Sequence, residues 1–192
     1  VLNHERGYDF LEYGLFDHTN ETLFKDVFQL RGGQNLIYNL ESNTFNINQW
    51  YKLEDKIVGQ NLSFEEASDK FKELFEDSVN LRLRSDVKVG SCLSGGLDSS
   101  SIVCTVNNLL KDIGEQTKQE TVSSCFDITK YDEQEFIDEV IQNTNTKSNK
   151  TFPKYNDLFN ELEKIVWHQD EPFGSTSIFA QWSVFRKAKE IG

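Results

Sequence analysis

Methionine is absent from the 192 residues, and proline occurs only twice. Since position 1 is valine, the sequence predicts either an excerpt of a longer protein or a chain from which modified methionines are missing. Long hydrophobic runs are also lacking: no stretch reaches the roughly 18 apolar residues of a membrane span, and the N-terminus has no signal-peptide pattern. We therefore expect a cytoplasmic protein with no membrane partner.

Basic residues are scarce, with 20 Lys and Arg against 32 Asp and Glu, which gives a formal net charge of −12. An excess of negative charge repels a phosphate backbone, so the composition disfavours a nucleic-acid partner. The three cysteines, Cys92, Cys104 and Cys125, form no Cys-x-x-Cys pair and lie among apolar neighbours. This pattern predicts buried, reduced thiols rather than disulfides or metal ligands.

A turn rich in glycine and serine stands out at residues 94–99, Ser-Gly-Gly-Leu-Asp-Ser. It follows the strand-like run 87–93 and leads into the predicted helix 98–111. Gly95 and Gly96 allow a tight turn and a close approach of a ligand, while the first N–H groups of the helix point at the turn. The serine hydroxyls add further polar groups, so the sequence predicts an anion site for phosphate or pyrophosphate.

This turn is not a Walker loop, because no lysine follows the glycines. The first turn of the predicted helix carries the carboxylate of Asp98 instead. A carboxylate repels a bare phosphate unless a divalent cation lies between them, so the sequence implies Mg²⁺.

The Ser-Gly-Gly-x-Asp-Ser stretch resembles the pyrophosphate loop of the N-type ATP pyrophosphatases. With its flanks it most resembles the synthetase domain of the glutamine-hydrolysing asparagine synthetases. The resemblance implies ATP and Mg²⁺ as cofactors, with Asp98 holding the metal and backbone groups of Leu93 and Ser124 holding the adenine. The implied nucleotide-binding residues are Leu93, Ser94, Gly95, Gly96, Asp98, Ser99 and Ser124.

Residues 1–55 differ in pattern from the rest of the chain. We expect short helices at 8–13 and 20–28 and a hairpin of strands 34–40 and 45–51. This region resembles the closing stretch of an Ntn-type glutaminase domain, although Leu30-Arg31 stands where the family usually has a proline pair. The segments that carry the resemblance are Gly14-Leu15-Phe16-Asp17, Thr22-Leu23-Phe24, Gly32-Gly33-Gln34 and Trp50-Tyr51.

The resemblance implies that residues 1–55 end a glutaminase domain and residues 56–192 begin an asparagine synthase domain. The catalytic cysteine of the glutaminase would then lie upstream of Val1, and a second synthetase motif would lie beyond Gly192. This sequence therefore contains no catalytic residue of its own, and we expect the excerpt to be inactive.

Residues 56–192 alternate between predicted helices and strands, which predicts an α/β fold with a doubly wound parallel sheet. A capping box opens the first helix, whose apolar stripe is expected to be core. The loops are expected at 111–118 and 142–149. The helices are predicted at 63–84, 98–111, 132–145, 155–168 and 177–190, and the extended segments at 87–93, 120–126 and 150–153.

Two other segments resemble parts of the family, and the first of them lies close to the synthetase pocket there. In Asp170-Glu171-Pro172-Phe173-Gly174, the two carboxylates are candidates to orient ATP or the amino-acid substrate, with capping of the loop as the alternative. Tyr131-Asp132-Glu133 opens a predicted helix, and an acidic first turn is ordinary helix chemistry, so a structural role is favoured there.

The function implied by the resemblance is ATP-dependent synthesis of asparagine, with aspartate, glutamine and ATP as small-molecule partners. Sugar amidotransferases, β-lactam synthetases and lasso-peptide cyclases share the layout and remain alternatives. Other pyrophosphate-loop enzymes, such as the GMP and NAD synthetases, share only the loop. A non-catalytic nucleotide-binding module is a further alternative, which the intact motif disfavours. We also expect self-association of the excerpt, with a homodimer as one form.

Overall fold

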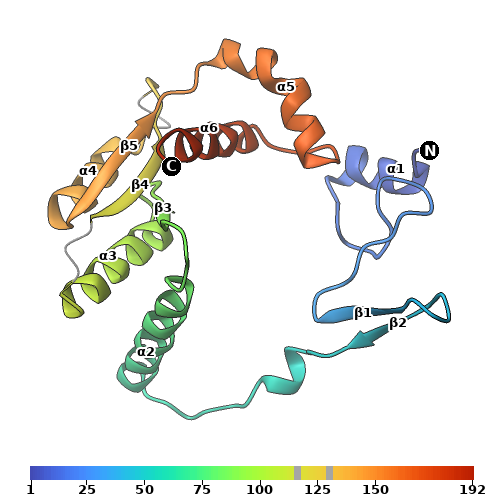
Figure 1. Cartoon of the computed structure of the whole chain (residues 1–192), viewed down its shortest axis with the longest axis horizontal. Coiled ribbons are helices and arrows are strands. Elements are labelled where there is room, and N and C mark those ends of the chain that lie inside the picture. The colour runs from blue at the N-terminus through green and yellow to red at the C-terminus, as the bar shows by residue number, and fades with distance from the viewer. Residues whose placement is uncertain (115–117, 129–131) are drawn as a thin grey trace. The chain divides into compact units, whose positions relative to one another are not determined.

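The computed structural model describes residues 1–114, 118–128 and 132–192. It divides into two units, Val1–Asn61 and Leu62–Gly192 (Figure 1). Within the described ranges, no helix combines the length and the apolar character that a membrane span requires.

The first unit is a short helix and a hairpin. Asn3 begins the helix by accepting a hydrogen bond from the Arg6 N–H at 3.4 Å, and Gly14 ends it with a left-handed φ of 65°. The strands pair antiparallel with Leu36 opposite Ile47, so the hairpin that the alternation predicts is present. The elements are α1 (His4–Tyr13), β1 (Gln34–Asn39), β2 (Thr44–Gln49) and the 3₁₀ helix η1 (Glu54–Lys56).

Residues 20–28 do not form the helix that we expected. Glu21 and Phe28 form an isolated antiparallel bridge instead. The Thr22 hydroxyl donates to the Val27 carbonyl at 2.9 Å, and such side-chain bonds offer the backbone an alternative to a helix. The prediction of a second N-terminal helix was wrong for this reason.

The second unit is a parallel sheet between helices. Its strands lie in the order β3-β4-β5, with α3 and α4 on one face and α6 on the other (Figure 1). The prediction of an α/β fold with a parallel sheet is confirmed. The elements are α2 (Phe64–Arg82), β3 (Gly90–Cys92), α3 (Leu97–Asp112), β4 (Gln119–Ser124), α4 (Gln134–Asn143), β5 (Thr146–Thr151), α5 (Tyr155–Gln169) and α6 (Ser177–Glu190).

The three described strands follow the order of the sequence. A doubly wound sheet reverses its strand order at one point, and that reversal is not among the strands that the structure describes. The predicted loop 111–118 includes residues 115–117, which lie outside the described residues.

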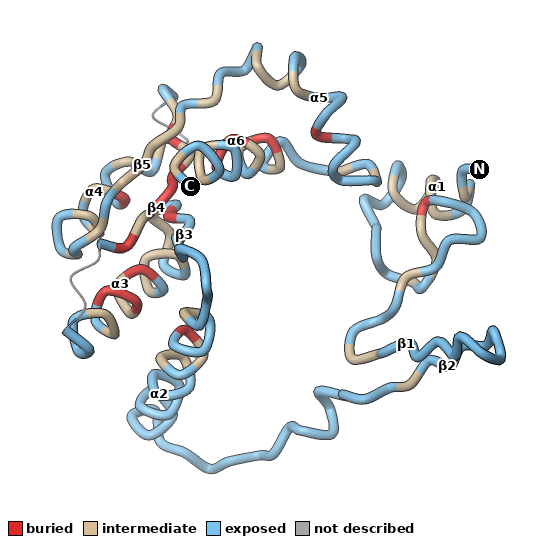
Figure 2. Tube along the Cα trace, in the orientation of Figure 1, coloured by how far each residue is buried: buried red, intermediate tan, exposed pale blue. Residues whose placement is uncertain are grey.

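The core of the second unit lies around β4, the central strand. Thr121 and Ser123 point to one face of the sheet and Val122 to the other, and all three are buried. Leu93 and Val103 belong to a buried cluster between the sheet and the helices α3 and α4, which also includes Cys125 and Ile137. Figure 2 shows the buried residues gathered on β4, α3 and α6.

Strand β5 occupies the second half of the segment 142–149 that we expected to be a loop, and the end of α4 occupies its first two residues. Its side chains are polar, so the apolar alternation that indicates a strand is missing. The polar side chains find partners on β4: Lys147 Nζ donates to one carboxylate oxygen of Glu120 at 2.8 Å, and Asn149 Nδ2 donates to the other at 2.7 Å. Pairing across strands thus stabilises a sequence that does not look like a strand.

The hydrogen bonds from Lys147 and Asn149 lower the pKa of Glu120. A carboxyl with a lowered folded-state pKa stabilises the fold above its unfolded pKa of about 4.3, and the contribution disappears as the pH falls through the folded value. We expect the free energy of unfolding of Glu120→Gln to fall less steeply than that of the unsubstituted chain as the pH drops below about 4.5. Urea unfolding at a series of pH values measures this free energy. The same pH dependence in both proteins below about pH 4.5 would contradict the prediction.

Helix α2 begins as predicted, with a capping box in which Ser63 and Glu66 exchange hydrogen bonds. Its apolar stripe is not core, however: Phe64 is 91% exposed and Phe71 is 68% exposed, whereas Val79 is buried. Figure 2 shows α2 exposed over most of its length. The expectation failed because the described neighbour of α2 is α3, which covers only one side of the helix.

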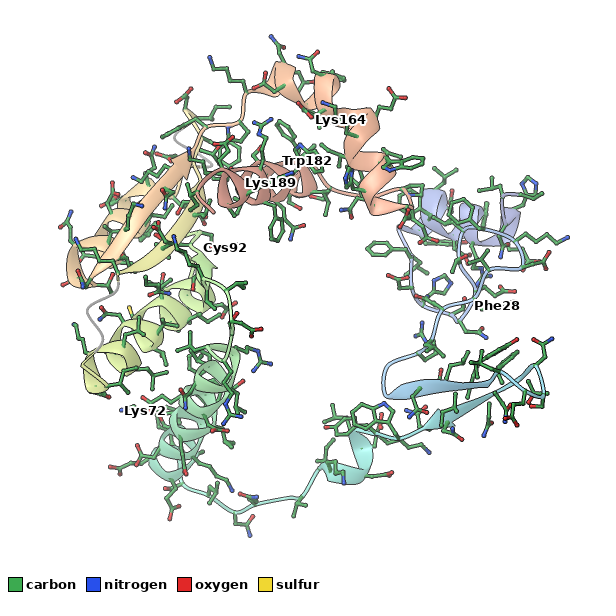
Figure 3. The ribbon with its side chains drawn as sticks, in the orientation of Figure 1. Phe28, Lys72, Cys92, Lys164, Trp182 and Lys189 are labelled. Atoms are coloured by element: carbon green, nitrogen blue, oxygen red, sulfur yellow. The ribbon has the colours of Figure 1, made fainter. Side chains whose placement is uncertain are left out.

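The cysteines are free, but they are not all buried as expected. Cys125 is buried and Cys104 is half-buried, whereas Cys92 is exposed. Cys92 lies on β3 at the edge of the described sheet, while α6 packs on β4 and β5 (Figure 3). The apolar neighbours of Cys92 in the sequence indicated a strand correctly, but not a covered one.

Candidate functional site

The turn between β3 and α3 is anchored in the core by Leu93. This side chain is 1% exposed, and its N–H donates to the Val122 carbonyl of β4 at 3.0 Å. Leu93 therefore continues the pairing of β3 with β4 by one residue. The following residues leave the sheet from a fixed point, which sets the position of the turn.

Two serine hydroxyls hold the turn together. The Ser99 Oγ donates to the Gly96 carbonyl at 3.2 Å and accepts from the Ser94 N–H at 3.2 Å. The Ser94 Oγ lies 3.1 Å from the Ser99 Oγ and accepts from the Gly96 N–H at 3.4 Å. Because all of these hydrogen bonds join residues within 94–99, the turn has a defined shape before any ligand binds.

Gly95 is required by the fold. Its φ is +85°, and a Cβ there would lie 2.9 Å from the Phe136 Cβ and 3.1 Å from the Glu133 carbonyl oxygen. The turn thus packs directly against the first turn of α4. A valine at position 95 would therefore disturb the fold as well as any ligand that approaches the turn.

Gly96 is not required in the same way. Its φ is −68°, which any residue adopts, and a Cβ there would meet only the Ser94 Oγ at 3.5 Å. Gly96 is the N-cap of α3, a position where serine, aspartate or asparagine would stabilise the helix more. The absence of a side chain leaves the backbone at the start of α3 open to an approaching group.

The start of α3 presents unpaired N–H groups. The N–H groups of Leu97, Asp98 and Ser99 have no acceptor among the described residues, and the first bond along the helix runs from the Ser100 N–H to the Gly96 carbonyl at 3.0 Å. These donors and the helix dipole favour an anion. The Asp98 carboxylate is exposed and has no ion pair in the part of the chain that the structure describes, so it can bind a cation there.

Ser124 ends β4, the strand that pairs with β3. Because the two strands are parallel, Ser124 lies at the same carboxyl edge of the sheet as the turn. The hydroxyls of Ser124 and Ser100 are buried and have no hydrogen-bond partner within residues 1–114, 118–128 and 132–192. Buried polar groups are rarely left unpaired, so a polar ligand at this edge would satisfy them.

The structure therefore brings the seven predicted residues to one edge of the sheet. Three of them come from the turn, two from the first turn of α3, and the others from the ends of β3 and β4. Nothing in the geometry assigns their roles, which stay predictions. The residues are Leu93, Ser94, Gly95, Gly96, Asp98, Ser99 and Ser124.

Asp170 and Glu171 follow α5, which is not one of the elements that form the turn. Asp170 ends α5 with a left-handed φ of 60°, so it has the capping role that was the alternative.

The start of α4 is the part of the site that sequence reasoning missed. Tyr131 lies outside the described residues, and an Asp132 oxygen accepts from the Gln134 N–H at 3.4 Å, which is a structural role. Glu133 and Phe136, however, supply the atoms against which Gly95 packs. No sequence signal links these residues to the turn, because nearly 40 residues separate them.

Comparisons with known proteins agree on one family. The family model described as asparagine synthase matches residues 70–192. A protein of Methanocaldococcus jannaschii named asparagine synthetase (glutamine-hydrolyzing) 2 is 33% identical over 172 residues, or 88% of this chain. Asparagine synthetase (glutamine-hydrolyzing) 1 of Bacillus subtilis is 35% identical over 59% of this chain, and the amidase chry2 of Gibberella zeae is 32% identical over 50%. The matched region covers 32%, 17% and 15% of these relatives, respectively.

Proposed function

We propose that this chain, which belongs to the asparagine synthase family, binds ATP at the turn between β3 and α3 as part of a glutamine-dependent amide ligase. The observation that carries the proposal is the open start of α3. There the side chain missing at Gly96 exposes three N–H donors, at the same edge of the sheet as Ser124, whose hydroxyl has no partner among the described residues. An elongated anion with a polar ring system, such as ATP, fits this edge: its phosphates would bind at the start of α3 and its ring near Ser124.

We further propose that the sheet of the second unit belongs to a doubly wound, pyrophosphate-loop type of fold. In the same way, we assign residues 1–55 to the end of an Ntn-type glutaminase domain and residues 56–192 to the synthase domain. The antiparallel hairpin supports the first assignment, and the match of the family model from residue 70 supports the second. The reduced thiols suit a cytoplasmic protein.

In the proposed reaction, a carboxylate oxygen of aspartate attacks the α-phosphorus of ATP. The bond from that phosphorus to the bridging oxygen breaks, pyrophosphate leaves, and an acyl-adenylate remains. Ammonia released from glutamine then attacks the acyl carbon, AMP leaves with the bonding electrons, and the amide forms after loss of a proton.

The residues of the turn suit the first step. The N–H groups at the start of α3 would bind the leaving pyrophosphate, and the hydroxyls of Ser94 and Ser99 would reorient from each other toward its oxygens. Asp98 would hold Mg²⁺, which neutralises charge on the phosphates. The backbone of Leu93 and Ser124 would bind the adenine.

Titration of this chain with ATP and Mg²⁺ tests the proposal. We expect saturable heat in calorimetry and shifts in the amide signals of residues 94–99 by NMR. Binding of ATP elsewhere, or no binding at all, would contradict the proposed site. In a protein that carries the complete synthase domain, pyrophosphate exchange with a panel of acids distinguishes aspartate from the sugar, β-lactam and peptide substrates of the alternative readings.

Asp98→Ala should remove the effect of Mg²⁺ on ATP binding. We expect the affinity in the presence of Mg²⁺ to fall at least about tenfold, toward that of the unsubstituted chain without the metal. In a full-length protein that carries both the glutaminase and the synthase domains, the same change should abolish ATP–pyrophosphate exchange and spare glutaminase activity. Asp112→Ala, at the other end of α3, is the matched control. Unchanged Mg²⁺ dependence in Asp98→Ala would refute the metal role.

A further inference from the structure

Three serines follow one another at the start of α3, and their hydroxyls differ in what they contact. The Ser99 Oγ donates to the Gly96 carbonyl at 3.2 Å, and the Ser101 Oγ donates to the Leu97 carbonyl at 2.8 Å. The Ser100 Oγ is buried and has no hydrogen-bond partner in the described part of the chain. Of these three hydroxyls, that of Ser100 therefore contributes no hydrogen bond to the fold that the structure describes.

The neighbouring residue explains why Ser100 is left without a partner. A serine within a helix can donate to the carbonyl four residues earlier, as Ser183 does to Phe179 at 3.1 Å. For Ser100 that carbonyl belongs to Gly96, which already accepts from the Ser99 Oγ and, at 3.0 Å, from the Ser100 N–H. A buried hydroxyl without a partner costs free energy, because it has lost its hydrogen bonds to water. A ligand that accepts a hydrogen bond from it would remove that cost.

Ser100 lies one helical turn after Gly96. Residues four apart share one face of a helix, and helical side chains lean toward the N-terminus. The position between Ser100 and the open start of α3 is therefore that of Gly96, which has no side chain. A Cβ at Gly96 would meet the Ser94 Oγ at 3.5 Å and no other atom of the described residues within 4 Å. The opening that Gly96 leaves thus adjoins Ser100 as well as the first N–H groups of α3.

We propose that Ser100 is a further phosphate-binding residue of this site, an inference that rests on the proposed binding of ATP at the turn. Rotation about the Cα–Cβ bond moves the Ser100 Oγ toward the opening at Gly96. There it donates to an oxygen of the β- or γ-phosphate, the part of ATP that leaves as pyrophosphate. Ser94 and Ser99 must give up their contact with each other to reach a ligand, whereas Ser100 gives up no hydrogen bond. The gain is a hydrogen bond to a charged group, so this hydroxyl favours the bound state over the free one.

Ser100→Ala tests the proposal in the free and the bound protein. Without ligand, we expect the variant to unfold at the same urea concentration as the unsubstituted chain or at a higher one, because it removes a buried polar group that has no partner. With Mg²⁺ present, we expect calorimetry to show dissociation constants of ATP and of pyrophosphate that are about tenfold higher. The affinity for AMP, which lacks the β- and γ-phosphates, should not change.

Ser101→Ala is the matched control. It removes a hydroxyl from the next position of the same helix and gains the same helix propensity, but that hydroxyl is bonded to the Leu97 carbonyl. We expect its ATP affinity to equal that of the unsubstituted chain. Equal losses of affinity in the two variants would overturn the role of Ser100, and so would a lower urea midpoint in Ser100→Ala than in Ser101→Ala, because the hydroxyl would then serve the fold.

The same titrations separate this inference from the proposed function. If ATP binds the unsubstituted chain and shifts the amide signals of residues 94–99, but binds Ser100→Ala equally well, the role of Ser100 is wrong and the proposed site stands. If Ser100→Ala weakens AMP as much as ATP, the hydroxyl does not bind the phosphates that leave. If ATP does not bind the unsubstituted chain, both the proposed site and the role of Ser100 are overturned.

Discussion

Gly96→Val is expected to abolish ATP binding while the chain stays folded. The φ of −68° at Gly96 suits any residue, and a Cβ there meets only the Ser94 Oγ at 3.5 Å, which is ordinary contact. The cost to the fold is the poor capping by valine, about 1 kcal/mol at most. The branched side chain would instead stand in front of the N–H groups of α3, where the phosphates are proposed to bind.

Calorimetry with ATP and Mg²⁺ measures the affinity, and urea unfolding measures the stability. Gly96→Ala is the graded control, because its smaller side chain should weaken binding less than valine does while changing stability as little. Full ATP affinity in Gly96→Val would show that the start of α3 is not the phosphate site. A loss of affinity accompanied by unfolding would show that the fold does need this glycine.

Gly95→Ala is expected to destabilise the second unit by about 2–4 kcal/mol. A residue with a Cβ is strained at a φ of +85°, and here the Cβ would also lie 2.9 Å from the Phe136 Cβ and 3.1 Å from the Glu133 carbonyl oxygen. Either the turn or the first turn of α4 must move. Denaturant unfolding followed by circular dichroism measures the change in the free energy of unfolding.

Gly114→Ala separates the effect of backbone strain at a positive φ from the effect of the close contact with α4. Gly114 has a similar φ of +70°, but a Cβ there would meet no atom of the described residues within 4 Å. We expect this variant to lose only the backbone contribution, about 1–2 kcal/mol. Equal effects of Gly95→Ala and Gly114→Ala would mean that the contact between the turn and α4 contributes nothing to stability.

Local signals in the sequence predicted the parts of the fold that depend on neighbouring residues. The Ser63 capping box, the glycine that ends α1 and the turn at 94–99 were all visible in the sequence, because each acts over a few residues. The strand before the turn and the helix after it were also predicted, and both are present on either side of the turn. Residues 20–28 show the limit, since the bonds of Thr22 overrode a plausible helix pattern.

The sequence by itself determined the chemistry of the turn and the α/β order of the elements. Only the tertiary structure decided which atoms meet. It brought Ser124 and the turn to the same edge of the sheet, packed Gly95 against α4, and made a strand of the polar segment Thr146–Thr151 through Glu120. It also left the apolar stripe of α2 exposed. The physical reason is the same throughout: hydrophobic periodicity and capping report how a segment folds, whereas burial and pairing depend on distant residues that no local pattern encodes.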